Sequence, residues 1–154
     1  MMMKIRIHHF FDMIRDFGIG KEILPHPNLH SYHRVARIIL ENPGTELELV
    51  VGADAVCKNC IHLKNGVCTD SITHRSDFTE KEAFNNHLDQ KIQEACQIDI
   101  SQKYSPEKLL AFARIYLDQM ETIYEGNADW HTQQRKENVI KGLEFYSGKH
   151  RLHF

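Results

Sequence analysis

The sequence contains no apolar segment that approaches the roughly 20 residues needed to cross a bilayer. Its first nine residues also lack the long apolar stretch and the small-residue cleavage site of a secretion signal. Positive charge is not in excess, because 19 Lys and Arg residues stand against 21 Asp and Glu residues. The usual electrostatic basis of nucleic-acid binding is therefore missing. We expect a soluble, cytoplasmic protein that binds neither membranes nor nucleic acids.

Catalytic signatures are also scarce in this chain. The sequence has no glycine-rich phosphate-binding loop, no internal repeat and no nucleophile motif of a known Ser/His/Asp or Cys/His type. The sequence therefore leaves open whether the protein is an enzyme. Four cysteines in an intracellular chain of 154 residues do not suggest a disulfide framework, and they indicate metal ligation or thiol chemistry instead.

The hydrophobic pattern predicts an α+β fold in a single domain, residues 1–154. Alternating apolar residues indicate strands at 3–7 and 45–51. The first strand leads into a helix at 8–17 that Gly18-Ile19-Gly20 is expected to end, and a second helix at 30–40 precedes the second strand. A helical connection favours a parallel pair of strands joined by a right-handed crossover. The expected sheet is short and two-stranded.

The C-terminal half, residues 79–148, is expected to be helical throughout. Thr79 and Glu82 have the spacing of a capping box, and Ser105 is followed by a proline, as a helix N-cap often is. Trp130 is expected to anchor the start of the last helix by packing. The predicted architecture is thus mostly helical, with a small sheet and a cysteine-rich metal loop.

That loop, residues 53–77, has no sustained hydrophobic period, so we expect a bound metal to organise it. Cys57 and Cys60 form a CxxC motif, whose turn aims both sulfurs to the same side. Cys68 returns after a turn at 64–66. A thioredoxin-like redox pair would not need this third thiol, and inert cysteines are uncommon in a hydrophilic loop. The three cysteines are therefore predicted metal ligands.

Cys96 lies in a different environment. It follows Ile92 by four residues on the apolar face of a predicted helix, where a cysteine behaves as a small hydrophobic residue. We expect Cys96 in the core, with a role as the fourth metal ligand as the alternative.

Three segments together, at 6–12, 52–57 and 88–96, resemble a family of small microbial proteins. This family is a domain of unknown function described as iron–sulfur-binding, and its pattern is His-His-x-x-Cys, then Asp-x-x-Cys-x-x-Cys, then a further Cys. The resemblance covers roughly residues 4–115. It implies that Cys57, Cys60 and Cys68 hold a cluster, and it places Asp12 where the family has its first cysteine.

Two functions remain open at this point. The first is an iron–sulfur protein whose cluster is held by the three cysteines with Asp12 near the fourth position, and which serves a redox partner or transforms a small-molecule substrate. The alternative is a zinc-stabilised binding module without catalysis, with Asp12 or His9 as fourth ligand. Because His8 and His9 are adjacent, we expect only one of the two imidazoles to face the metal.

The remaining candidates have structural interpretations. Asp54 is expected to accept hydrogen bonds from backbone N–H groups of the cysteine loop. His26, His30 and His33 are expected to form a solvated helix end, with a second metal site as the alternative.

Overall fold

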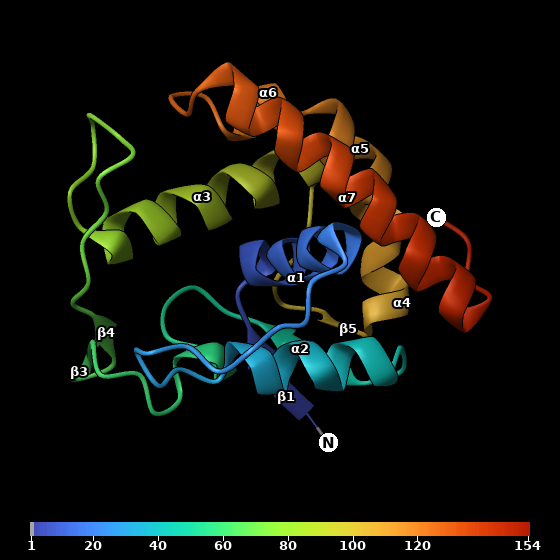
Figure 1. Ribbon diagram of the computed structural model, residues 1–154, viewed down its shortest axis with the longest axis horizontal. Coiled ribbons are helices and arrows are strands. Elements are labelled where there is room, and N and C mark those ends of the chain that lie inside the picture. The colour runs from blue at the N-terminus through green and yellow to red at the C-terminus, as the bar shows by residue number, and fades with distance from the viewer. Residues whose placement is uncertain (1) are drawn as a thin grey trace.

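The computed structural model describes residues 2–154 and has a mostly helical α+β fold with two small sheets (Figure 1). Strand β1 (Met2–Ile5) pairs with β2 (Glu46–Leu49) in parallel, as the sequence predicts. A third strand, β5 (Lys103–Tyr104), adds to β2 in the antiparallel direction. The expectation of two strands is therefore incomplete, because a strand of two residues has no alternation by which to recognise it.

The first and last helices, α1 (Ile7–Ile19) and α7 (Asp129–His150), pack closely together. A Cβ atom on Gly18 would lie 1.9 Å from the carbonyl oxygen of Asn138, and one on Gly142 would lie 1.8 Å from that of Ile14. The predicted stop at Gly18-Ile19-Gly20 is therefore confirmed at Gly20 and not at Gly18. Gly18 lies inside α1, where its missing side chain lets α7 approach, and Gly20, with a φ of 79°, ends the helix.

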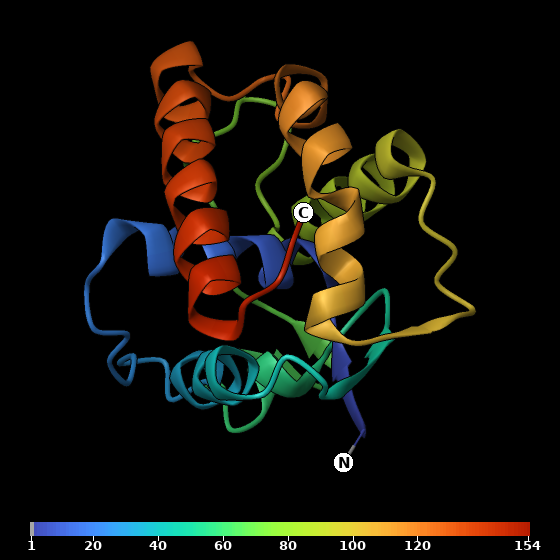
Figure 2. The same ribbon diagram turned by 90° about the vertical axis from the view of Figure 1, so that its right-hand side faces the viewer.

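The other helices lie on both sides of α1. Helix α2 (Tyr32–Glu41) connects the two parallel strands, and α3 (Lys81–Cys96) crosses the molecule beside α1. Figure 2 shows α7 next to a rod of short helical segments, with α2 on the opposite side of the molecule. These segments are α4 (Pro106–Leu109), η2 (Leu110–Phe112), α5 (Ala113–Asp118) and α6 (Met120–Ile123).

The predicted Ser105 cap and the predicted burial of Cys96 are confirmed, whereas the predicted capping box and the predicted packing of Trp130 are wrong. The side chain of Ser105 caps α4, and Cys96 is buried in the core with 4% exposure. Glu82 does not close a capping box with Thr79, because α3 begins at Lys81 and the Glu82 carboxylate binds elsewhere.

Trp130 is not a packing anchor, since 70% of its surface is exposed. It precedes the buried Val139 by nine residues, or about two and a half helical turns, and so lies on the opposite face of α7.

The cysteine segment contains more regular structure than its pattern suggests. It begins with the single turn η1 (Ala55–Cys57) and continues into a hairpin of β3 (Leu63–Lys64) and β4 (Val67–Cys68). The expected turn before Cys68 is confirmed: Asn65 and Gly66 both have positive φ, as a two-residue hairpin turn requires.

No helix in residues 2–154 is long and apolar enough to cross a membrane.

Candidate functional site

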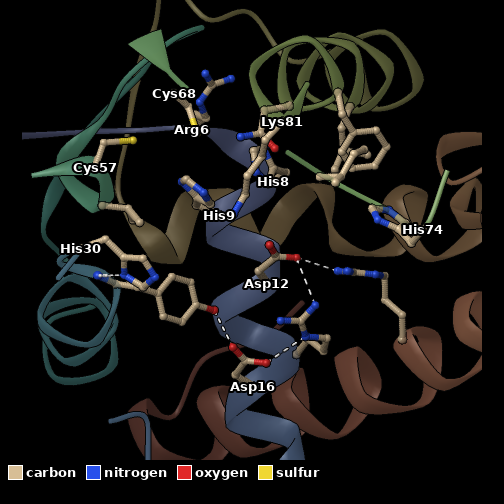
Figure 3. Close-up of a pocket in the computed structure, with 18 of the residues that line it drawn as sticks. Arg6, His8, His9, Asp12, Asp16, His30, Cys57, Cys68, His74 and Lys81 are labelled. Carbon is tan, nitrogen blue, oxygen red and sulfur yellow. Dashed lines mark hydrogen bonds and ion pairs between the residues drawn. The ribbon is translucent and has the colours of Figure 1, made fainter. Parts of the chain in front are cut away.

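A cavity of about 450 Å³ lies between α1, the cysteine loop, α3 and α7 (Figure 3). Its lining includes all five residues predicted as metal ligands: His9, Asp12, Cys57, Cys60 and Cys68. These residues come from two segments about 50 positions apart in the chain, which the fold brings around one space. Their role as ligands stays a prediction.

The donor atoms around the cavity do not converge on a single point. Among residues 2–154, no group of three or more His, Cys, Asp or Glu side chains is placed to hold one metal ion. The cysteines therefore share a cavity without forming a ready-made site for a single ion.

Asp54 organises the first part of the cysteine loop. Its Oδ1 accepts a hydrogen bond from the backbone N–H of Val56 at 3.1 Å and from the Cys57 thiol at 3.5 Å. The expected capping role of Asp54 is thus confirmed. Burial raises the pKa of Cys57 to about 11. A thiol in this state is protonated at neutral pH, unlike the thiolate of a catalytic cysteine.

Cys68 is fixed to α3 through its backbone. Its N–H donates a hydrogen bond to Oε2 of Glu82 at 3.1 Å, and Oε1 of the same carboxylate binds the Arg6 guanidinium at 3.1 Å. Glu82 therefore connects the hairpin that carries Cys68 to the buried arginine at the start of α1.

His8 and His9 both line the cavity, with ring centroids 4.3 Å apart, and the expectation that only one of them faces a metal stays a prediction. Each imidazole uses Nδ1 to bind a buried carboxylate: His8 binds Asp89 at 2.6 Å, and His9 binds Asp54 at 2.7 Å. An ionised carboxylate only accepts, so each Nδ1 is the donor. Nε2 of each ring, with its lone pair, is the atom available to a ligand.

The pKa shifts of Asp54 and His9 agree with the donor role of Nδ1 in this pair. Burial acts to raise the pKa of Asp54, but His9 overrides it and holds this pKa at about 2. Burial likewise acts to lower the pKa of His9, and Asp54 raises it above its ordinary value. The two groups therefore form a mutually stabilised carboxylate–imidazole pair.

Arg6 also lines the cavity and is 1% exposed. Its guanidinium binds Asp89 at 2.9 Å in addition to Glu82, while its Nε has no hydrogen-bond partner among residues 2–154. Two carboxylates, those of Glu82 and Asp89, thus bind one guanidinium, and a third, that of Asp54, accepts a hydrogen bond from the backbone N–H of Arg6 at 2.7 Å. This imbalance makes the region attractive to a cation.

Sequence reasoning did not find this network around Arg6. Its side-chain partners lie 76 to 83 residues further along the chain, and no local spacing connects them. The one available signal was the resemblance that included the His-His pair beside Arg6.

Asp12 has a different set of partners from those expected of a metal ligand. Its Oδ1 accepts hydrogen bonds from Arg135 at 2.6 Å and from Arg15 at 3.4 Å. Burial opposes ionisation, but the two guanidinium groups hold the pKa of Asp12 well below its ordinary value. Its carboxylate is therefore already neutralised by cationic partners, as the dashed lines in Figure 3 show.

Two further histidines, His26 and His30, line the cavity from the loop before α2, with stacked rings 4.5 Å apart. His33 is not part of this lining. The expectation of a solvated helix end is therefore incomplete for His26 and His30, because they belong to the wall of the cavity.

Comparison with known families gives one result. The model of a family described as "Protein of unknown function (DUF1284)" matches residues 28–132 of this chain. The match includes all three cysteines of the loop and begins after His8, His9 and Asp12. No curated protein and no solved structure matches the chain.

Proposed function

The chain belongs to the DUF1284 family of proteins of unknown function, and we propose that it binds an iron–sulfur cluster in the cavity beside α1. Cys57, Cys60 and Cys68 are the proposed thiolate ligands. Bound there, the cluster supplies electron transfer or an exchangeable iron for substrate chemistry.

The observation that carries this proposal is the arrangement of the three cysteines. They line one cavity of about 450 Å³, yet no three donor side chains in residues 2–154 converge on one point. A cluster binds each cysteine through a different iron, so its ligands stay farther apart than those of a single ion. Cysteines that line one cavity but do not converge on one point are therefore better suited to a cluster than to a single ion.

His9 is the proposed fourth ligand, in place of Asp12. The Asp12 carboxylate is bound by two guanidinium groups, whereas His9 binds Asp54 through Nδ1 and its Nε2 has no hydrogen-bond partner among residues 2–154. A carboxylate behind a ligating imidazole fixes the ring and its tautomer. Asp54 also contacts the Cys57 thiol, so one carboxylate orients two of the proposed ligands.

Zinc binding is the second candidate, supported by the charge around Arg6. The Arg6 guanidinium binds two carboxylates, and the Asp54 carboxylate lies beside its backbone N–H, so carboxylates outnumber this guanidinium and favour a divalent cation. A single zinc would draw the loop cysteines together around it. In that case the protein is a metal-stabilised binding module without catalysis.

Anaerobic purification followed by elemental analysis and visible absorption tests both candidates. Iron with acid-labile sulfide and a broad brown absorption supports the cluster, and about one equivalent of zinc in colourless protein supports the module. If the protein holds neither metal, even after reconstitution with iron and sulfide, the proposal is wrong.

Serine variants identify the ligands in the same assay. Replacing Cys57, Cys60 or Cys68 should remove or sharply weaken the metal, because a hydroxyl is a much poorer ligand than a thiolate. The matched control is Cys96→Ser, which should keep its metal, since Cys96 is buried in the core away from the cavity.

A further inference from the structure

The wall of the cavity continues from the proposed metal ligands to a second group of polar side chains. Five rings follow one another along it, with successive centroid distances of 4.3, 6.5, 6.3 and 4.5 Å. In order, these rings are His8, His9, Tyr32, His30 and His26. Figure 3 shows His30 on the same side of α1 as Cys57. The proposed metal centre therefore occupies only one end of this wall.

The hydrogen bonds of His26 and His30 place their protons on the opposite nitrogen from those of His8 and His9. Nδ1 of His26 accepts from the backbone N–H of Asn28 at 3.0 Å, and Nδ1 of His30 accepts from that of Tyr32 at 3.4 Å. In a neutral ring whose Nδ1 accepts, the proton is on Nε2. Both rings are thus hydrogen-bond donors at Nε2.

Lys81, at the start of α3, adds a cation to the same cavity. Its only carboxylate partner within 4 Å among residues 2–154 is Asp70, at 3.6 Å. Burial lowers the pKa of His30, and the nearby His26 and Lys81 lower it further. We refer to His26, His30 and Lys81 as the donor group.

The carboxylates of the cavity do not oppose an anion at the donor group. Asp12 is bound by Arg15 and Arg135, and Asp16 accepts hydrogen bonds from Arg15 at 2.8 Å and from the Tyr32 hydroxyl at 2.5 Å. An incoming anion therefore meets two imidazole N–H donors and a lysine, while Asp12 and Asp16 are already bound by cationic or hydroxyl partners.

The lining also has an apolar part, formed by Val56, Ile72, Phe84 and Leu88. A cavity of about 450 Å³ with apolar walls and a few placed polar groups is typical of a small-molecule site. We propose that the cavity binds a small organic anion, with a carboxylate or phosphate held by the donor group and an apolar body against these side chains. This ligand is the substrate class that the site accepts, and its binding does not depend on the metal, since no member of the donor group is a proposed metal ligand.

Calorimetric titration with three matched probes tests this proposal. Benzoate, phenyl phosphate and benzamide share an apolar ring, and only the first two carry an anionic group. We expect at least one of the anions to bind about tenfold or more tightly than benzamide, and the tighter anion identifies the carboxylate or the phosphate as the natural group. Equal binding of benzamide, or no binding of any probe at millimolar concentration, would overturn the proposal.

Variants assign the binding to the donor group. Lys81→Met and His30→Phe should each weaken the anion about tenfold, since each removes one donor while keeping much of the side-chain volume. Lys91→Met, on the same helix and outside the cavity lining, should not change the affinity. Unchanged affinity in both Lys81→Met and His30→Phe would contradict the proposal, and thermal melting confirms that each variant is folded.

The titrations are run on the protein as purified and again after chelation, with the metal content measured in both samples. Anion binding in both samples supports the proposal, whether or not any metal is found, so a failure of the metal proposal is seen separately. Binding that disappears with the metal would show that the metal and not the donor group holds the anion, and would overturn the inference.

Discussion

Two pairs of histidines face the same cavity, and they differ in the partner of Nδ1. His8 and His9 donate from Nδ1 to the buried carboxylates of Asp89 and Asp54, whereas His26 and His30 accept at Nδ1 from backbone N–H groups. The first pair therefore presents lone pairs to the cavity and the second pair presents protons. The same side chain is therefore suited to a metal ion or to an anion according to what binds its other nitrogen.

The largest effect is expected from removing the carboxylate behind His8. Asp89→Ala leaves the guanidinium of Arg6 and the imidazole of His8 buried beside a lost partner. Breaking a buried pair in this way should lower the free energy of unfolding by about 3–5 kcal/mol. Urea denaturation of the metal-free protein measures the loss. Glu94→Ala, on the exposed face of the same helix, is the control, and a similar small loss in both variants would contradict the role given to Asp89.

A second substitution is expected to change the affinity for the proposed metal more than the stability of the fold. Asp54→Asn removes the negative charge that holds Nδ1 of His9 as a donor, so the ring can present a proton to the cavity instead of a lone pair. We expect the affinity for the metal to fall about 10–100-fold, as for other carboxylates behind a ligating imidazole. Competition with a chelator measures this change. An unchanged affinity would mean that His9 is not a ligand.

The two pairs should also differ in the sign of their pH dependence. Asp54 raises the pKa of His9 above 6.5, so its stabilisation is complete below pH 6.5 and is lost as the pH rises through the folded-state pKa. Burial lowers the pKa of His30 below 6.5, so its contribution is present above pH 6.5 and is lost as the pH falls through its folded-state pKa. NMR titration of the metal-free protein should place the two midpoints on opposite sides of 6.5, and midpoints on the same side would refute this.

The smallest effect is expected at His26, which is exposed. His26→Phe should change the free energy of unfolding by no more than about 0.5 kcal/mol, as is usual for surface substitutions. His8→Phe is the matched variant in the other pair. It should cost about 1–3 kcal/mol, because it leaves Asp89 without one of its buried hydrogen-bond partners. Equal changes in the free energy of unfolding at His26 and His8 would contradict this difference between the two pairs.

The sequence predicts those features that depend on neighbouring residues. The parallel strands, the Ser105 cap, the turn before Cys68 and the burial of Cys96 all follow from local period or from turn and cap residues. The position of Gly18 inside α1 could not be predicted in this way, because it depends on a backbone contact with α7, at a distance of more than 100 residues.

In the candidate site, too, features set by neighbouring residues were predictable, and features set by distant contacts were not. The cysteine motif was visible as a spacing, and the structure places all three sulfurs around one cavity. The role of Lys81 and of the stacked His26 and His30 was not visible, since it depends on the folded position of the loop before α2. Asp12 was assigned by its place in a family pattern, and only the fold shows that Arg135 already binds it.

The glycine contact between α1 and α7 lies on the same two helices as the ion pair between Asp12 and Arg135. Gly142 lies seven residues beyond Arg135, and Gly18 lies six residues beyond Asp12, so each glycine is only about 10 Å along its helix from the ion pair. A single methyl group added at either glycine would push α1 and α7 apart, and the separation would extend to Asp12 and Arg135. A substitution at either glycine would therefore reach the cavity wall without altering any residue that lines it.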